Sequence, residues 1–219
     1  MHTEIDSLSD RELKESVDSF NRNPEKIDFS RYDYLITLVG YSFEPSYFFL
    51  QAVNPKKTLF ICTPETEKSI DVILEKKPLK PSQYIKKIVN GTDTPAIYSS
   101  VKEFSMDREC ARILIDGTAG KKAMTMGISL AGFYFNYTLA YCDYGGYDNE
   151  KRRPVKGTEF PVLIKNPYNI FGTKEIDKAR GHLSRYDFDG ALLILEELER
   201  GITENIGEIR ALINICRAY

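Results

Sequence analysis

Several features that mark other classes of protein are missing from this sequence. Its 219 residues include two histidines and four cysteines that do not cluster, which argues against a zinc site. No apolar run reaches the roughly 20 residues needed to cross a bilayer, and the polar, acidic segment 1–20 does not resemble a signal peptide. We therefore expect a soluble, cytoplasmic protein.

A strong charge of either sign is also missing. The chain has 30 basic and 32 acidic residues and a net charge of −2. A protein dedicated to duplex DNA is normally basic overall, so this balance argues against such a role. A hydrophobic content of 42% is sufficient for a core, and the length suits one domain with at most a small appendage.

The cysteines show no CxxC pairing. Cys62, Cys110, Cys142 and Cys216 are widely spaced, and three of them lie in or beside apolar runs. A free thiol in such a place behaves as a small hydrophobic side chain. We expect reduced cysteines in the core.

Apolar runs alternate with helical patterns through the middle of the chain. The expected strands are 32–40, 57–63, 86–92, 111–118 and 137–145. The helices expected between them are 45–53, 64–77, 95–104 and 119–135. The runs are continuously apolar, as in strands covered on both faces. The pattern predicts an α/β fold, with a doubly wound, mostly parallel, Rossmann-like sheet.

The two ends of the chain differ from this middle part. Segment 1–30 is expected to form a leading helix, over 7–20, and a linker. The sheet domain is expected over 31–171, including a polar loop at 145–159 and a further strand at 160–168 that suits an antiparallel edge. Segment 172–219 carries three apolar helical stripes. The third stripe is still running at Tyr219, so we expect the natural protein to continue.

In open α/β sheets, ligands bind where the carboxyl ends of the strands lead into loops. Three such turns are "GYSFEPS" (40–46), "CTPET" (62–66) and "NGTDTP" (90–95). Thr63 is expected to cap a helix that begins at Pro64. Asp93-Thr94-Pro95 is expected to supply a cap followed by proline at the first position of the next helix.

The fourth turn, "DGTAGKK" (116–122), predicts an anion site. Its small residues allow the backbone to approach a ligand closely, and the following helix directs N–H groups and the positive end of its dipole outward. Lysines are disfavoured at that end of a helix, so Lys121 and Lys122 make most sense if an anion binds there. The alternative is that both lysines are only solvated and the glycines only form a turn.

Standard catalytic and nucleotide-binding motifs are absent. The sequence contains neither GxxxxGK[ST] nor GxGxxG, so a phosphate-bearing ligand is indicated without ATP hydrolysis or the usual mode of NAD binding. His182, on the appended helices, is expected to be a surface or boundary residue rather than a general base. The basic cluster Lys151, Arg152, Arg153 and Lys156 could contact phosphates or belong to a solvated loop.

Residues 116–124, "DGTAGKKAM", resemble the D-x-T-G-G-T-K-x-M turn of CARF domains, the CRISPR-associated Rossmann-fold sensors of type III systems. "LVGYSFEPSYFFL" (38–50) resembles the other ligand-facing loop of that family. Segments 157–172 and 179–198 resemble its passage from sensor to helical domain. Ala119 replaces the usual glycine and Lys121 the usual threonine, whereas Lys122 falls on the family's lysine.

The resemblance implies a homodimer that binds cyclic oligoadenylate across its two-fold axis and switches an effector domain attached beyond Tyr219. We favour the tetra-adenylate over the hexa-adenylate ring and expect no metal, no catalytic residue and no other cofactor. The 144–156 loop would act as a lid. The ligand-binding residues implied are Gly40, Tyr41, Ser42, Phe43, Glu44, Thr63, Pro64, Thr92, Asp93, Thr94, Asp116, Gly117, Thr118, Ala119, Gly120, Lys121 and Lys122.

Three other functions compete with a sensor. The same pocket could cleave its ligand as a ring nuclease, with Ser42, Lys121 and Lys122 stabilising the developing charge. A transcriptional regulator would read DNA with the C-terminal helices, but the glutamates there would repel phosphates. An unrelated Rossmann enzyme acting on a nucleotide-linked small molecule is the third.

Overall fold

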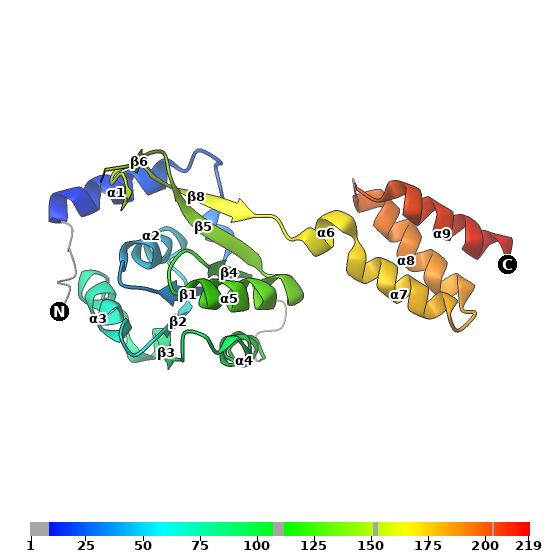
Figure 1. The fold of residues 1–219 in the computed structure, drawn as a ribbon, viewed down its shortest axis with the longest axis horizontal. Helices are drawn as coiled ribbons and strands as arrows, with labels where there is room; N and C mark the ends of the chain where they lie inside the picture. The colour runs from blue at the N-terminus through cyan, green and yellow to red at the C-terminus, as the bar shows by residue number, and fades with distance from the viewer. Residues whose placement is uncertain (1–8, 107–111, 151–152, 203) are drawn as a thin grey trace. The chain divides into compact units, whose positions relative to one another are not determined.

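A six-stranded sheet forms the centre of the first part of the chain (Figure 1). The computed structural model describes residues 9–106, 112–150, 153–202 and 204–219. The strand order is β3-β2-β1-β4-β5-β8, and every pair is parallel except β5 with β8. The strands are β1 (Tyr34–Val39), β2 (Lys57–Cys62), β3 (Tyr84–Ile88), β4 (Ile113–Asp116), β5 (Thr138–Tyr144) and β8 (Glu159–Ile164). The predicted mostly parallel sheet with an antiparallel edge strand is confirmed.

Helices cover both faces of this sheet (Figure 1). In β1, Leu35 and Val39 face a core shared with α1 (Asp10–Arg22), α2 (Glu44–Val53) and α3 (Glu67–Lys76). Ile36 and Leu38 face a second core, shared with α4 (Thr94–Ser105) and α5 (Lys122–Tyr134). Burial of both sides of each central strand explains why the apolar runs in the sequence do not alternate. The predicted doubly wound fold is confirmed.

The leading helix α1 packs onto the sheet unit. Ser9 caps it, and Ser9 and Glu12 form a capping box. Phe20 on its inner face lies 5.5 Å from Phe48 and 4.9 Å from Phe49, measured between ring centroids. α1 is therefore part of the compact unit Met1–Ile164 rather than a segment apart from it.

The remaining residues, Lys165–Tyr219, form a second compact unit made of helices. Its members are α6 (Pro167–Phe171), α7 (Thr173–Leu183), α8 (Phe188–Gly201) and α9 (Ile206–Ala218). Ile176, Leu195 and Ile213 belong to its separate core. The three apolar stripes of the sequence correspond to α7, α8 and α9. The strand predicted for 160–168 ends at Ile164, because Asn166 caps α6 through the backbone N–H of Tyr168.

Several predicted boundaries are displaced for identifiable reasons. β3 lies earlier than the predicted 86–92, since Asn90 accepts hydrogen bonds from the backbone and hydroxyl of Thr92 and closes a turn. α5 begins at Lys122 rather than Ala119, because Gly120 has a φ of +88°. Within the polar loop, β6 (Tyr147–Asp148) and β7 (Arg153–Pro154) pair as a short hairpin.

The described cysteines are core thiols, as predicted. Cys62, Cys142 and Cys216 are free and buried, whereas Cys110 lies outside the described residues. Burial raises the pKa of Cys62 to about 11, and it also raises the pKa of Cys142. In the part of the chain that the structure covers, no helix combines the length and the apolar character that a membrane span requires.

Candidate functional site

The order of the strands reverses between β1 and β4, so the turns that follow these two strands meet at one edge of the sheet. Their contact is close. A Cβ atom built on Gly40 would lie 3.1 Å from the backbone nitrogen of Gly120 and 3.4 Å from the Cβ of Ala119. Glycine at position 40 lets the two backbones come together here.

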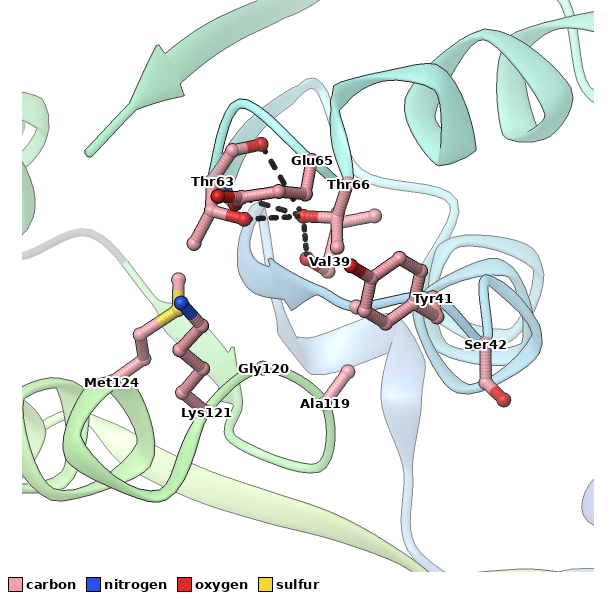
Figure 2. Close-up of a pocket in the computed structure, with 11 residues that line it drawn as sticks. Val39, Tyr41, Ser42, Thr63, Glu65, Thr66, Ala119, Gly120, Lys121 and Met124 are labelled. Atoms are coloured by element: carbon pink, nitrogen blue, oxygen red, sulfur yellow. Dashed lines mark hydrogen bonds between the residues drawn. The ribbon is translucent and has the colours of Figure 1, made fainter. Parts of the chain in front are cut away.

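A pocket of about 370 Å³ opens at this edge of the sheet (Figure 2). It is formed by the turns after β1, β2 and β4 together with the first turn of α5. Its lining residues are Val39, Gly40, Tyr41, Ser42, Thr63, Glu65, Thr66, Ala119, Gly120, Lys121 and Met124. Seven of these were predicted from the sequence: Gly40, Tyr41, Ser42, Thr63, Ala119, Gly120 and Lys121.

The two ends of the pocket differ chemically. Figure 2 shows the ammonium group of Lys121 and the carboxylate of Glu65 toward one end, with Tyr41 and Ser42 toward the other. The Lys121 side chain extends over Gly91, where a Cβ would lie 2.6 Å from the lysine Cδ. Tyr41 is 64% exposed, so its ring is accessible beside the pocket.

No side chain caps the N-terminus of α5, which starts at the pocket. Lys121 occupies the N-cap position with extended backbone, and no side-chain hydrogen bond is made there. Gly120, immediately before it, has a φ of +88° and so adopts a conformation that disfavours other residues. An uncapped helix start directs its N–H groups and positive dipole toward whatever occupies the pocket.

Asp116 stabilises the turn from the protein interior and does not line the pocket. It is fully buried, and one carboxylate oxygen accepts bonds from the backbone N–H and the hydroxyl of Thr118, at 2.9 and 2.6 Å. The other accepts from the Thr37 hydroxyl at 2.7 Å. Burial raises the pKa of Asp116. Thr118 in turn accepts from the backbone N–H of Cys142, and Gly117 donates to the carbonyl of Ala140, so these predicted residues hold the turn together.

Glu44 was predicted to face the ligand, but its carboxylate pairs with another residue of the chain. It is buried and lies 3.1 Å from the ammonium of Lys156. This ion pair joins the turn after β1 to the loop that was predicted to form a lid. Phe43 is buried in the core. Of the predicted basic cluster, Lys151 and Arg152 lie outside the described residues.

The turn before α4 contributes indirectly. Asp93 caps α4 by accepting from the backbone N–H of Ala96 at 3.0 Å, and the helix begins at Thr94 rather than at the predicted Pro95. Thr94 packs against Gly127 of α5, where a Cβ would lie 3.3 Å from the Thr94 Cβ. Thr92 bonds to Asn90. None of Thr92, Asp93 and Thr94 is among the lining residues.

Lys122 and Pro64 are exposed but do not line the pocket of a single chain. Lys122 begins α5, and the side chains one, two and three turns further along that face, Met126, Leu130 and Tyr134, are 64%, 59% and 59% exposed. His182, in the C-terminal unit, lies 2.6 Å from Asp187, which caps α8.

Four lining residues were missed: Val39, Glu65, Thr66 and Met124. Thr66 donates to the carbonyl of Val39 at 2.9 Å and accepts from the backbone N–H of Thr63 at 3.2 Å. The prediction that Thr63 caps a helix starting at Pro64 was wrong, because Thr66 occupies the N-cap and α3 begins at Glu67. Glu65 and Thr66 therefore belong to a turn at the pocket, and the "CTPET" stretch contained the signal.

The sequence is similar to a curated protein. It is 34% identical over 94 residues to the CRISPR system endoribonuclease Csm6 of Thermus thermophilus, a match that covers 41% of this chain and 20% of the relative. The chain thus spans about a fifth of the length of that relative. No family model matches the sequence.

Two solved structures are similar to this chain to different degrees. Enterococcus italicus Csm6, bound to cyclic hexa-2′-fluoro-hexa-dAMP, superimposes with a TM-score of 0.54 at 9% identity, over 85% of this chain and 54% of that one. Can2 from Sulfobacillus thermosulfidooxidans, in complex with cyclic tetra-adenylate, gives a TM-score of 0.47 at 16% identity, over 52% of this chain and 32% of that one. The first of these supports the Rossmann-like fold assigned above.

Proposed function

We propose that the sheet unit is a CARF domain of the type III CRISPR effectors and that it binds a cyclic oligoadenylate at the carboxyl edge of its sheet. The observation that carries this proposal is the pocket between the turns after β1 and β4, with Lys121 and the uncapped start of α5 on one side. The free N–H groups and the positive dipole end of a helix N-terminus favour the binding of a phosphate. The sequence similarity to one Csm6 and the cyclic adenylate analogue bound to another support the choice of a cyclic adenylate among phosphate-bearing ligands.

We also propose that two copies meet along α5 and place their pockets on either side of a two-fold axis. The exposed apolar stripe of Met126, Leu130 and Tyr134 supports this, since it continues from Lys122 at the pocket end of the helix. A symmetric interface repeats the same patch on both subunits. It would bring two Lys122 side chains toward one polyanionic ring, which a single chain does not do.

The proposed role is that of a sensor within a larger effector. The relative named an endoribonuclease is much longer than the matched region, which supports an output activity outside this sheet unit. The C-terminal helices do not favour DNA binding instead. Arg180, Arg210 and Arg217 pair with Glu208, Glu199 and Glu196 at 2.6 Å each.

Calorimetric titration with cyclic rings of three to six adenylates tests the ligand. We expect one ring per two chains, with one ring size preferred. Chromatography of the ring after prolonged incubation separates the two roles that the pocket allows. An unchanged ring supports a sensor, whereas linear products support a ring nuclease that uses Ser42 and Lys121, both of which line the pocket. Failure to bind any of these rings would refute the proposal.

The dimer is tested by charging the α5 stripe. Leu130→Glu is expected to give monomers by light scattering and to weaken ring binding, because a carboxylate at the centre of an apolar interface is costly to bury. Leu193→Glu is the matched control, since Leu193 is 73% exposed on α8 of the other unit. A Leu130→Glu protein that remains dimeric would place the interface elsewhere.

A further inference from the structure

Glu65 puts a carboxylate into the wall of a pocket that otherwise suits an anion. Glu65 and Lys121 are the charged side chains among its described lining residues. Every phosphodiester of the proposed ring is negative and repels Glu65. The carboxylate is favourable in this position only if it accepts hydrogen bonds from donors that the ligand provides.

A tight turn holds Glu65 in place. The backbone N–H of Thr66 donates to the carbonyl of Thr63 at 3.0 Å and closes the turn around Pro64 and Glu65. The Thr66 hydroxyl ties this turn to the end of β1 through the carbonyl of Val39. The neighbouring hydroxyl of Thr63 is the main cause that lowers the pKa of Glu65, with a smaller contribution from Lys121. Glu65 is therefore an ionised acceptor at neutral pH.

A closed ring of adenylates offers two kinds of donor, the 6-amino group of adenine and the 2′-hydroxyl of ribose. The amino group stands beside an acceptor nitrogen, and this pattern suits the amide of Asn or Gln, whereas a carboxylate would face the lone pair of that nitrogen. A hydroxyl can turn its single hydrogen toward a carboxylate without such a conflict. The 2′-hydroxyl is the better match for Glu65.

Lys121 strengthens this match. The charged groups of Glu65 and Lys121 lie toward the same end of the pocket in Figure 2, and the two side chains interact electrostatically. In a ribonucleotide the 2′-hydroxyl and the 3′-phosphate are on adjacent carbons. An acceptor beside a cation therefore corresponds to one hydroxyl and its neighbouring phosphate.

We propose that Glu65 and Lys121 form a subsite for the ribose 2′-hydroxyl and its adjacent phosphate, so that the pocket selects ribonucleotide over deoxyribonucleotide rings. The inference rests on the proposed ligand. A contact with the 2′-hydroxyl is the means by which a protein distinguishes RNA from DNA at a given position.

The test compares cyclic tetra- and hexa-adenylate with their 2′-deoxy counterparts, using calorimetry on the full chain. The wild type is expected to bind the ribonucleotide ring at least about tenfold more tightly than the matched deoxy ring. In Glu65→Ala this ratio is expected to fall below roughly threefold, since the acceptor is gone. Glu65→Gln is expected to keep part of the ratio through its amide oxygen. Glu67→Ala, which removes a carboxylate outside the lining, is the control and should keep the full ratio.

Unfolding curves exclude a trivial loss of structure, because Glu65 is exposed and its replacement should leave the melting temperature nearly unchanged. The proposal is overturned if Glu65→Ala keeps the wild-type ratio, or if it tightens both rings equally, since the carboxylate would then act only as a repelling charge. Wild-type protein that binds neither ring overturns the ligand assignment itself. The two failures are therefore distinguishable.

Discussion

Two helices start at the same edge of the sheet, and their N-termini are capped differently. At α4, Asp93 caps the helix from within the chain, and Pro95 occupies the first turn. At α5, Gly120 with its positive φ and the extended Lys121 precede the helix, and no side chain caps it. The N-terminus of α4 is capped by its own chain and does not line the pocket. The N-terminus of α5 borders the pocket. The two starts therefore differ in one respect that bears on the proposed binding: a side chain of the chain itself caps α4, whereas none caps α5.

The largest expected effect comes from removing the buried support of the α5 turn. Asp116→Ala leaves the backbone N–H and hydroxyl of Thr118 without their acceptor, and the hydroxyl of Thr37 keeps only Ser46 as a close partner. We expect a loss of about 3 kcal/mol in the free energy of unfolding, measured with urea, because unpaired buried groups are costly. The corresponding loss for Asp116→Asn should be much smaller, since the amide keeps an oxygen for Thr118. An equal loss of unfolding free energy in both variants would contradict this explanation, because the amide oxygen would then contribute nothing through its hydrogen bonds to Thr118.

Asp116 also predicts a pH dependence. Burial raises its pKa in the folded state above the unfolded value, so its contribution to stability is fully present below the unfolded pKa. That contribution is lost as the pH rises through the folded pKa. Asn at this position does not titrate. Between about pH 4 and 8 the stability of Asp116→Asn should therefore rise relative to the wild type, as urea unfolding at a series of pH values would measure. A difference that stays constant with pH would place the titration of Asp116 outside this range.

Removing the lysines tests the binding side of the comparison. Lys121→Ala and Lys122→Ala are each expected to weaken binding of the cyclic adenylate at least about tenfold, or ~1.4 kcal/mol. Both losses should shrink at high salt, because exposed charges are screened. Thermal unfolding of the free protein should stay near the wild-type temperature. Normal binding by Lys122→Ala would remove Lys122 from the site, and normal binding by Lys121→Ala would move the site away from this pocket.

The smallest expected effect is on the capped helix. Asp93→Ala should cost about 1 kcal/mol in the free energy of unfolding through loss of the N-cap. The affinity for the ring, measured by the same titration, should be unchanged, because Asp93 does not line the pocket. A clear loss of affinity would show that the turn before α4 takes part in binding after all.

Much of the fold could be predicted because its signals are local. The continuous apolar runs of β1, β2 and β4 reflect helices on both faces, and the small residues before Lys121 mark the sharp turn into α5. Gly40 could be placed at the site for the same reason. Each of these signals lies within a few neighbouring residues.

The parts that were missed depend on distant contacts or on the direction of a side chain. Asp116 ends its strand with the side chain turned into the core, where Thr37 of a neighbouring strand bonds to it. Glu44 pairs with Lys156, more than a hundred positions away in the sequence. Glu65 was missed because a threonine followed by a proline also suits a helix start, which hid the turn that brings Glu65 to the pocket.

The single antiparallel strand determines where the chain leaves the sheet. β8 starts with Glu159 opposite Tyr144, at the carboxyl edge, and ends with Ile164 opposite Leu139, at the amino edge. The chain therefore leaves the sheet at the rim opposite the one at which the pocket opens. Through its pairing with β5, β8 links these two rims by one continuous hydrogen-bonded strand.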